Sequence, residues 1–164
     1  MKDPYSEIAE RLQLQISDLD RLVKRSLLSW SRVKESPEEQ SLYLDAVALN
    51  LHGFYSGLER LFELIARHVD NMLPDGERWH YELLKQMTED KERIRPAVIN
   101  KGNFSSLDEL RRFRHLVRNV YTFNLSPEKM ENLISNLPGL WLQIKNELEA
   151  FSDFLIDLSQ TVRK

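Results

Sequence analysis

The chain of 164 residues contains no cysteine and only five glycines. The missing thiols exclude a disulfide framework, thiol catalysis and a cysteine-ligated metal. Scarce glycine, with 41% hydrophobic and 30% charged residues, is typical of a helix-rich protein. No hydrophobic run is long enough for a membrane span, and the amino-terminal segment lacks the apolar core of a secretion signal. The sequence therefore predicts a soluble, cytoplasmic protein without membrane association.

Length and charge narrow the possibilities further. A chain of this length can bury a sizeable core, and we expect a single domain over residues 1–164. The formal net charge of −3 excludes a protein that coats nucleic acid non-specifically. It remains compatible with a local basic site.

Hydrophobic residues recur at helical spacing, which predicts an all-α, up-and-down bundle of about five helices. Asp3 and Pro4 predict the start of a first helix that ends near Glu35. A capping serine followed by a proline, Ser36 and Pro37, predicts the start of the second helix. The apolar seam of the second helix alternates spacings of four and three residues, and it comprises Leu44, Ala48, Leu51, Tyr55, Leu58, Phe62, Ile65 and Val69.

Two glycines, Gly53 and Gly57, lie one turn apart in this second helix. Each costs about 0.5–1 kcal/mol relative to alanine in a helix interior, so we expect another backbone to approach closely there. After the second helix, the sequence predicts a turn at Pro74–Gly76, a short helix from about Arg78 to Asp90 and a loop over 95–104. A helix over 105–125 follows. The last helix is capped by Ser126 and Pro127, and we expect it to kink or break at Pro138 and Gly139.

The helix over 105–125 is amphipathic. Ser105 with Asp108, or Ser106 with Glu109, has the spacing of a capping box. At about 100° per residue, one side of this helix is apolar and consists of Leu107, Leu110, Phe113, Leu116, Val117, Val120 and Tyr121. The other side is a basic strip, formed by Arg111, Arg112, Arg114, His115, Arg118, Asn119 and Thr122. Its four arginines, set against two acidic residues, give a local charge of +2; on charge alone, a solvated bundle face accounts for this strip.

Within the strip, the segment RHLVRNVY resembles the signature of HEPN domains and, among them, of the HepT-like ribonuclease toxins. The family pattern is an arginine, a polar residue, three further residues, a histidine, one residue and a tyrosine. Arg114, His115 and Tyr121 match the arginine, the polar residue and the tyrosine. Asn119 stands where the family has its catalytic histidine. The resemblance covers most of the chain.

The resemblance implies a function and partners. The function is metal-independent cleavage of RNA, with tRNA as one candidate substrate, by the toxin component of a toxin–antitoxin pair. The resemblance also implies a homodimer whose two motifs line one cleft, and it implies no cofactor. The expected antitoxin is a minimal nucleotidyltransferase, which would silence the toxin by adenylylating Tyr121.

The residue types of the strip suit this chemistry. Cleaving RNA without a metal requires a base, an acid and cationic groups that bind the phosphate. We expect Arg111, Arg114 and Arg118 to bind phosphate, because a guanidinium offers paired donors and keeps its charge. We expect the catalytic set to be Arg114, His115, Asn119 and Tyr121. His115 would replace the missing histidine, whose loss typically costs about 10²–10⁴ in rate.

Other candidate sites are weaker. Glu77 and His80 have the spacing of one half of a di-iron site in a helical bundle, but such a site needs two pairs, so we predict no metal. Trp79 with His80 is able to stack on a base, although we interpret Trp79 as the anchor of a short helix.

Asn119 leaves the function open between alternatives. One is an RNA-cleaving toxin, weakened because asparagine does not exchange protons near neutral pH. Another is a HEPN-fold protein that has lost catalysis and acts as the binding or antitoxin-like partner of a nucleotidyltransferase. The plainest alternative is a helical interaction module with no role in nucleic-acid chemistry.

Overall fold

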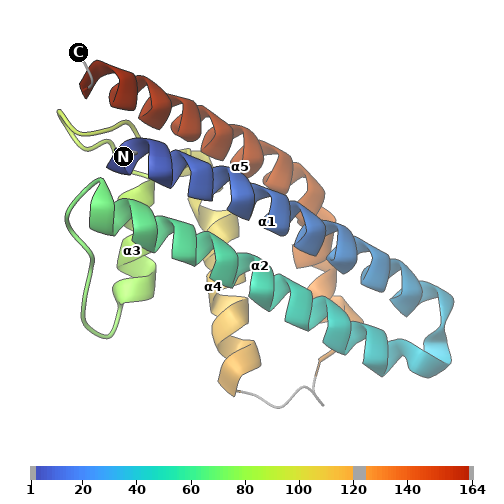
Figure 1. Ribbon diagram of the computed structural model, residues 1–164. Coiled ribbons are helices and arrows are strands. Elements are labelled where there is room, and N and C mark those ends of the chain that lie inside the picture. The colour runs from blue at the N-terminus through green and yellow to red at the C-terminus, as the bar shows by residue number, and fades with distance from the viewer. Residues whose placement is uncertain (1–2, 120–124, 163–164) are drawn as a thin grey trace.

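The computed structural model describes residues 3–119 and 125–162, and the side chains of Arg118 and Asn119 lie outside that description. Within the described part, the chain forms five α-helices and no β-strand (Figure 1). The helices are α1 (Pro4–Glu35), α2 (Gln40–His68), α3 (Trp79–Met87), α4 (Phe104–Asn119) and α5 (Pro127–Val162). The predicted all-α bundle is confirmed.

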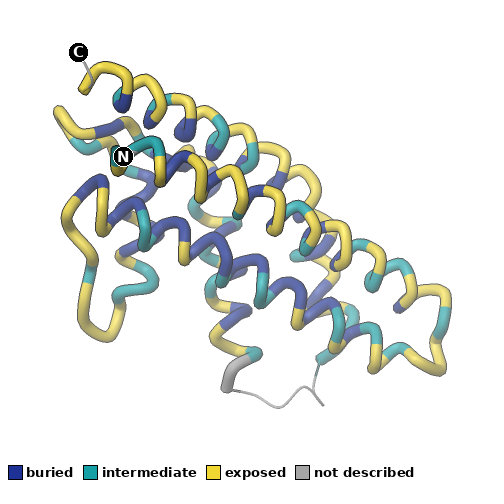
Figure 2. Tube along the Cα trace, viewed as in Figure 1, coloured by how far each residue is buried: buried dark blue, intermediate teal, exposed yellow. Residues whose placement is uncertain are grey.

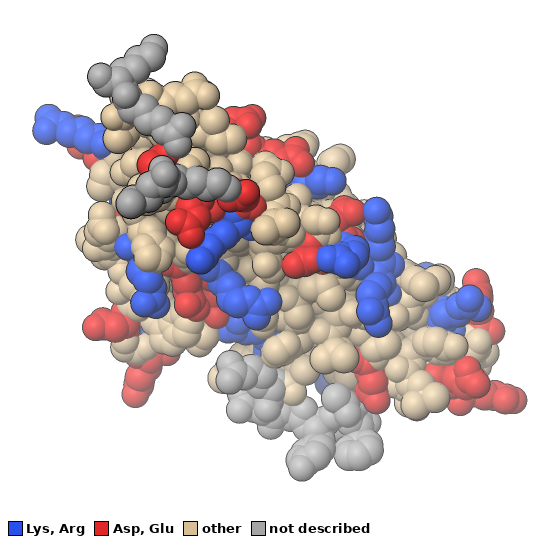
Figure 3. All heavy atoms as spheres, viewed as in Figure 1, with Lys and Arg blue, Asp and Glu red and all other residues tan. Residues whose placement is uncertain are grey.

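The three long helices form the body of the molecule. In Figure 1, α1 runs antiparallel to α2 and α5, and it packs against both. The short helices α3 and α4 run across these long helices and contact α2 and each other. Every residue of the predicted seam of α2 is buried, and Figure 2 shows that the buried positions face the inside of the bundle. Figure 3 shows acidic and basic side chains interspersed on the face toward the viewer.

The helix starts match the predictions only in part. The Asp3 carboxylate caps α1 by accepting hydrogen bonds from the backbone N–H groups of Tyr5 at 3.0 Å and Ser6 at 3.2 Å, as predicted. The predicted cap by the Ser36 side chain is wrong. Residues Pro37–Glu39 form a 3₁₀ turn, η1, whose last N–H donates to the Ser36 carbonyl at 3.0 Å rather than to its hydroxyl.

The start of the motif helix is also corrected. Asn100 caps a second 3₁₀ turn, η2 (Lys101–Asn103), by accepting a hydrogen bond from the Gly102 N–H at 2.8 Å. Because α4 continues directly from η2 at Phe104, Ser105 and Ser106 lie inside the helix and form no N-cap. The last helix, α5, contains Pro138 and continues through it, so the predicted break is absent from this described segment.

The two glycines of α2 make room for side chains rather than for a backbone. A Cβ on Gly57 would lie 2.7 Å from Gln15 Nε2 and 2.8 Å from Leu19 Cδ2, both on α1. A Cβ on Gly53 would lie 3.6 Å from a methyl of Leu22, which is an ordinary contact. The expected close backbone approach is therefore wrong at both positions.

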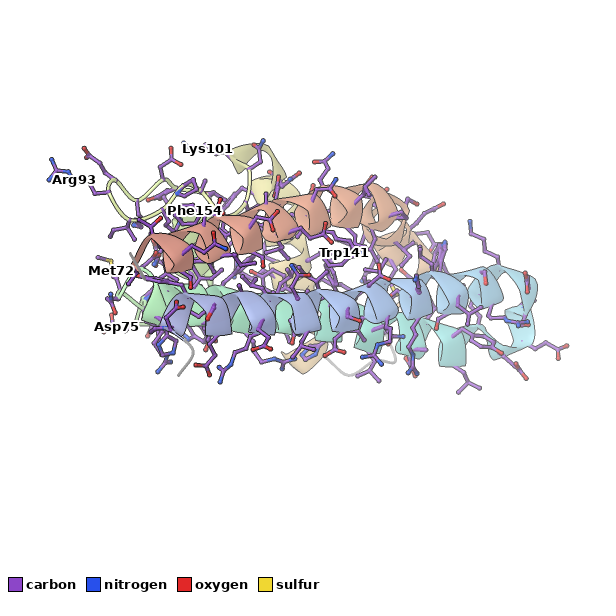
Figure 4. All side chains as sticks on the ribbon, turned by 45° about the horizontal axis from the view of Figure 1, so that its top comes forward. Met72, Asp75, Arg93, Lys101, Trp141 and Phe154 are labelled. Atoms are coloured by element: carbon purple, nitrogen blue, oxygen red, sulfur yellow. The ribbon has the colours of Figure 1, made fainter. Side chains whose placement is uncertain are left out.

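Buried polar contacts fix the short elements in place. Arg95 donates to Asp70 through Nε at 2.6 Å and through Nη2 at 2.7 Å, and both side chains are buried. Gln86 of α3 also donates to Asp70 at 2.7 Å. Because Asp70 follows α2 directly, this network ties the end of α2 to α3 and to the loop that leads to α4. On the other side of the bundle, the indole N–H of Trp141 donates to Asp20 at 3.0 Å and joins α5 to α1 (Figure 4).

None of the described helices combines the length and apolarity that crossing a membrane requires.

Candidate functional site

The motif arginine lies inside the bundle. Arg114 is 6% exposed, and its guanidinium makes a paired contact with the carboxylate of Glu59 on α2. Nη1 donates to Oε1 at 2.9 Å, and Nη2 donates to Oε2 at 3.2 Å. The helical wheel placed Arg114 on a basic outer strip, and that placement is wrong.

The inward turn of Arg114 follows from how α4 packs. Arg114 lies seven residues after Leu107 and four after Leu110, so all three share one side of the helix, and all three are buried. Because α4 contacts both α2 and α3, its buried face is rotated toward Arg114. Leu116, which the wheel placed on the apolar side, is 45% exposed as a result.

His80 completes a cluster with this ion pair. Its Nδ1 lies 2.8 Å from Glu59 Oε2 and 2.9 Å from Arg114 Nη2. An ionised carboxylate only accepts hydrogen bonds and a guanidinium only donates them. Nδ1 can therefore either carry a proton and donate to Glu59, or lack one and accept from Arg114. We assign the proton to Nδ1, which then donates to Glu59, because the anion is the stronger partner. The 2.9 Å approach of Arg114 Nη2 to Nδ1 is then a close contact and not a hydrogen bond. This tautomer leaves the lone pair on Nε2.

Aromatic rings enclose the cluster. The guanidinium carbon of Arg114 lies 5.3 Å from the centre of the Tyr55 ring, and the Trp79 ring lies 3.6 Å from the His80 ring. The Tyr55 hydroxyl has no hydrogen-bond partner among the described residues. Burial, together with the nearby charge of Glu59, raises the pKa of Tyr55. The ion pair is therefore held in a largely dry environment.

A cleft of about 600 Å³ lies beside the cluster, between α3 and α4. Its walls include Arg78, Trp79, His80 and Tyr81 on one side and Arg111 and His115 on the other. The guanidinium carbons of Arg78 and Arg111 lie 4.7 and 5.6 Å from the centre of the Tyr81 ring. The cleft thus combines two guanidinium groups, two imidazoles and aromatic surfaces with one carboxylate, that of Glu77.

The predicted site residues are only partly brought together. Arg111 and His115 line the cleft, and Arg111 forms an ion pair with Asp108 at 2.8 Å. Arg118 and Asn119 are the last residues of α4. Tyr121 lies outside the described residues, so its predicted roles remain predictions.

Sequence reasoning missed Glu59 and assigned no role to His80. Glu59 follows Tyr55 by four residues and precedes Phe62 by three, so it lies on the inner side of α2, where an acidic residue needs a partner. His80 precedes Leu83, Leu84 and Met87 on α3 at helical spacing. These inward-facing positions were the only features of the two residues that could have indicated a buried polar cluster from the sequence. The sequence could not show that Glu59 pairs with Arg114, because 55 residues separate them.

The described helices form an all-α bundle, and residues 114–119 of the motif lie on α4. The family model described as HepT-like protein matches residues 46–155, about two thirds of the chain, and the chain belongs to this HepT-like family. The matched region contains Glu59, His80 and Arg114. Comparisons with curated proteins and with solved structures gave no match.

Proposed function

We propose that this HepT-like protein is a metal-independent endoribonuclease that cleaves RNA in the cleft between α3 and α4, as the toxin of a toxin–antitoxin pair. The observation that carries the proposal is the composition of the cleft. Arg111 and His115 from the motif helix face Arg78 and the aromatic side chains of α3 across one opening. Phosphate-binding groups and a proton donor are thereby available in the same place.

The cleft suits single-stranded RNA. Unstacked bases bind to aromatic side chains at about 1–3 kcal/mol per base, which Trp79 can supply. Arg78 and Arg111 would bind the phosphates, because guanidinium groups pair with phosphate oxygens and keep their charge. Both arginines also contact the Tyr81 ring, which limits their motion before RNA binds.

Arg111 is better placed than Arg114 to bind phosphate. Both terminal nitrogens of Arg114 are already committed to Glu59 inside the bundle. Phosphate binding by Arg114 would require exchange of that buried carboxylate. Arg111 pairs with the carboxylate of Asp108 and contacts the Tyr81 ring, and its side chain lines the cleft.

The proposal is tested by incubating the purified chain with tRNA and total RNA in excess EDTA. Arg111→Ala should weaken RNA binding and reduce the salt dependence of the affinity, because fewer counterions are released. Arg112→Ala is the matched control: Arg112 pairs with the same Asp108 at 3.4 Å but lies outside the cleft lining. Equal effects of the two substitutions, or intact RNA with the natural chain, would contradict the proposal.

A second function is favoured by one specific observation. The motif arginine pairs with Glu59, and Asn119 stands where the family has its catalytic histidine. This supports a non-catalytic partner of a minimal nucleotidyltransferase. Co-purification with a nucleotidyltransferase encoded beside it, with no RNA cleavage by the chain alone, would favour this function. Intact-mass measurement would then show whether Tyr121 receives AMP.

A further inference from the structure

His80 is the cleft residue that is tied directly to the buried ion pair. Its Nδ1 contacts Glu59 at 2.8 Å, and its ring stacks against Trp79 with 3.6 Å between ring centres. The side chain remains 28% exposed and lines the cleft. One edge of the imidazole is therefore fixed, and Nε2 is the nitrogen left to exchange a proton with a ligand.

We infer that His80 is the catalytic base of RNA cleavage, that Glu59 and Arg114 are its positioning residues, and that His115 is the acid. This inference rests on the proposed ribonuclease function. It assigns the missing proton acceptor to α3 instead of to position 119 on the motif helix. Asn119 is then not a defect, because the imidazole that the motif lacks comes from another helix.

The reaction balances with these two imidazoles. His80 Nε2 takes the proton of the RNA 2′-hydroxyl as the 2′-oxygen attacks phosphorus and forms the new P–O bond. The bond between phosphorus and the 5′-oxygen breaks, and the leaving oxygen takes a proton from protonated His115. The products are a 2′,3′-cyclic phosphate and a free 5′-hydroxyl. One imidazole gains a proton and the other loses one, so neither an oxidant nor a metal is consumed.

The buried pair suits the positioning role. Glu59 accepts the Nδ1–H bond, which sets the tautomer. Its charge favours the imidazolium that forms when Nε2 takes up a proton, and the Arg114 guanidinium at 2.9 Å opposes part of that effect. Arg114 holds the carboxylate through two parallel hydrogen bonds, which fix the orientation of Glu59. Arg114 therefore acts on the reaction through Glu59 and His80, not by contact with phosphate.

The test compares His80→Ala, His80→Gln and His115→Ala on an RNA oligonucleotide in EDTA. Each substitution should lower kcat by about 10²–10⁴ with little change in KM. His68→Ala is the control, since that imidazole is exposed at the end of α2, away from the cleft. The His80→Gln variant and thermal melting of all four variants separate a lost base from a lost fold.

A second substrate distinguishes base from acid. In this oligonucleotide a sulfur replaces the bridging 5′-oxygen, and a thiolate leaves without being protonated. The His115→Ala variant should recover most of its rate on this substrate, and His80→Ala should not. Free imidazole should restore part of the activity of His80→Ala. Glu59→Gln leaves Arg114 without its anionic partner and should lower stability, so it is assayed below its melting temperature. There it should lower kcat while leaving KM near its natural value.

Three results would overturn the inference. If the natural chain cuts RNA and the folded His80→Ala variant cuts equally fast, the base lies elsewhere, although the ribonuclease function stands. A tenfold gain from Asn119→His together with that result would return the base to position 119. If the natural chain cuts no RNA, the proposed function fails and the assignment of His80 fails with it.

Discussion

Glu59 and Arg114 face each other as opposite charges inside the bundle, and each offsets the cost of removing the other from water. We expect Glu59→Leu or Arg114→Met alone to lower the free energy of unfolding by about 3–5 kcal/mol, because a buried charge is left unpaired. The double variant should recover most of that loss. Urea unfolding followed by circular dichroism measures all three. Single variants within about 1 kcal/mol of the natural chain would mean that the pair is exposed to water in solution.

A second residue, Glu147, makes stability depend on pH. Burial raises the pKa of its carboxyl, while an accepted hydrogen bond from Asn103 at 3.0 Å opposes that rise. Because the folded chain favours the protonated form, the stability that Glu147 contributes is present at low pH and is lost as the pH rises through its folded pKa. Glu147→Gln should therefore be more stable than the natural chain at neutral pH. The difference should vanish below about pH 4, where the carboxyl is protonated in both states. The reverse order in urea unfolding at neutral pH would contradict this.

At the scale of the helix, Gly57 and Gly53 differ in what surrounds them. Gly57→Ala places a methyl within 2.8 Å of buried Leu19, so overpacking of about 1–3 kcal/mol should exceed the gain in helix propensity. Gly53→Ala has room against Leu22 at 3.6 Å and should stabilise the protein by about 0.5–1 kcal/mol. Thermal melting of the two variants should move in opposite directions. Equal shifts would show that α1 and α2 leave room for a methyl group at Gly57.

The helices differ in how much of their structure the sequence could predict. Helix α2 was predictable because its seam from Leu44 to Val69 is a local, repeating pattern, and the cap at Asp3 depends on its immediate neighbours. The inward turn of Arg114 was not predictable from a helical wheel, which sorts residues by type. Whether a charge is buried depends on its partner, and Glu59 is 55 residues away in the sequence. The cleft was missed for the same reason, since its two walls come from separate helices.

For the whole molecule, the family resemblance predicts a homodimer. Arg114 points into the bundle. On an ideal helix, five residues at about 100° each separate positions 114 and 119 by about 140°, which is why we expect two chains to complete one motif site. We expect light scattering at micromolar concentration to give twice the chain mass of 19.4 kDa. A mass of 19.4 kDa across that range would contradict the dimer. The assignment of His80 and His115 would stand, because both line one cleft of a single chain.

We propose that this chain cuts RNA without a metal, using two imidazoles in one cleft. The most direct measurement is the initial rate of tRNA cleavage in excess EDTA, with the product ends analysed, for the natural chain and for His80→Ala with His115→Ala. The natural chain should produce 2′,3′-cyclic phosphate ends, and the folded double variant should not exceed the uncatalysed background. Intact tRNA after incubation with the natural chain, or equal cleavage by both proteins, would contradict this proposal.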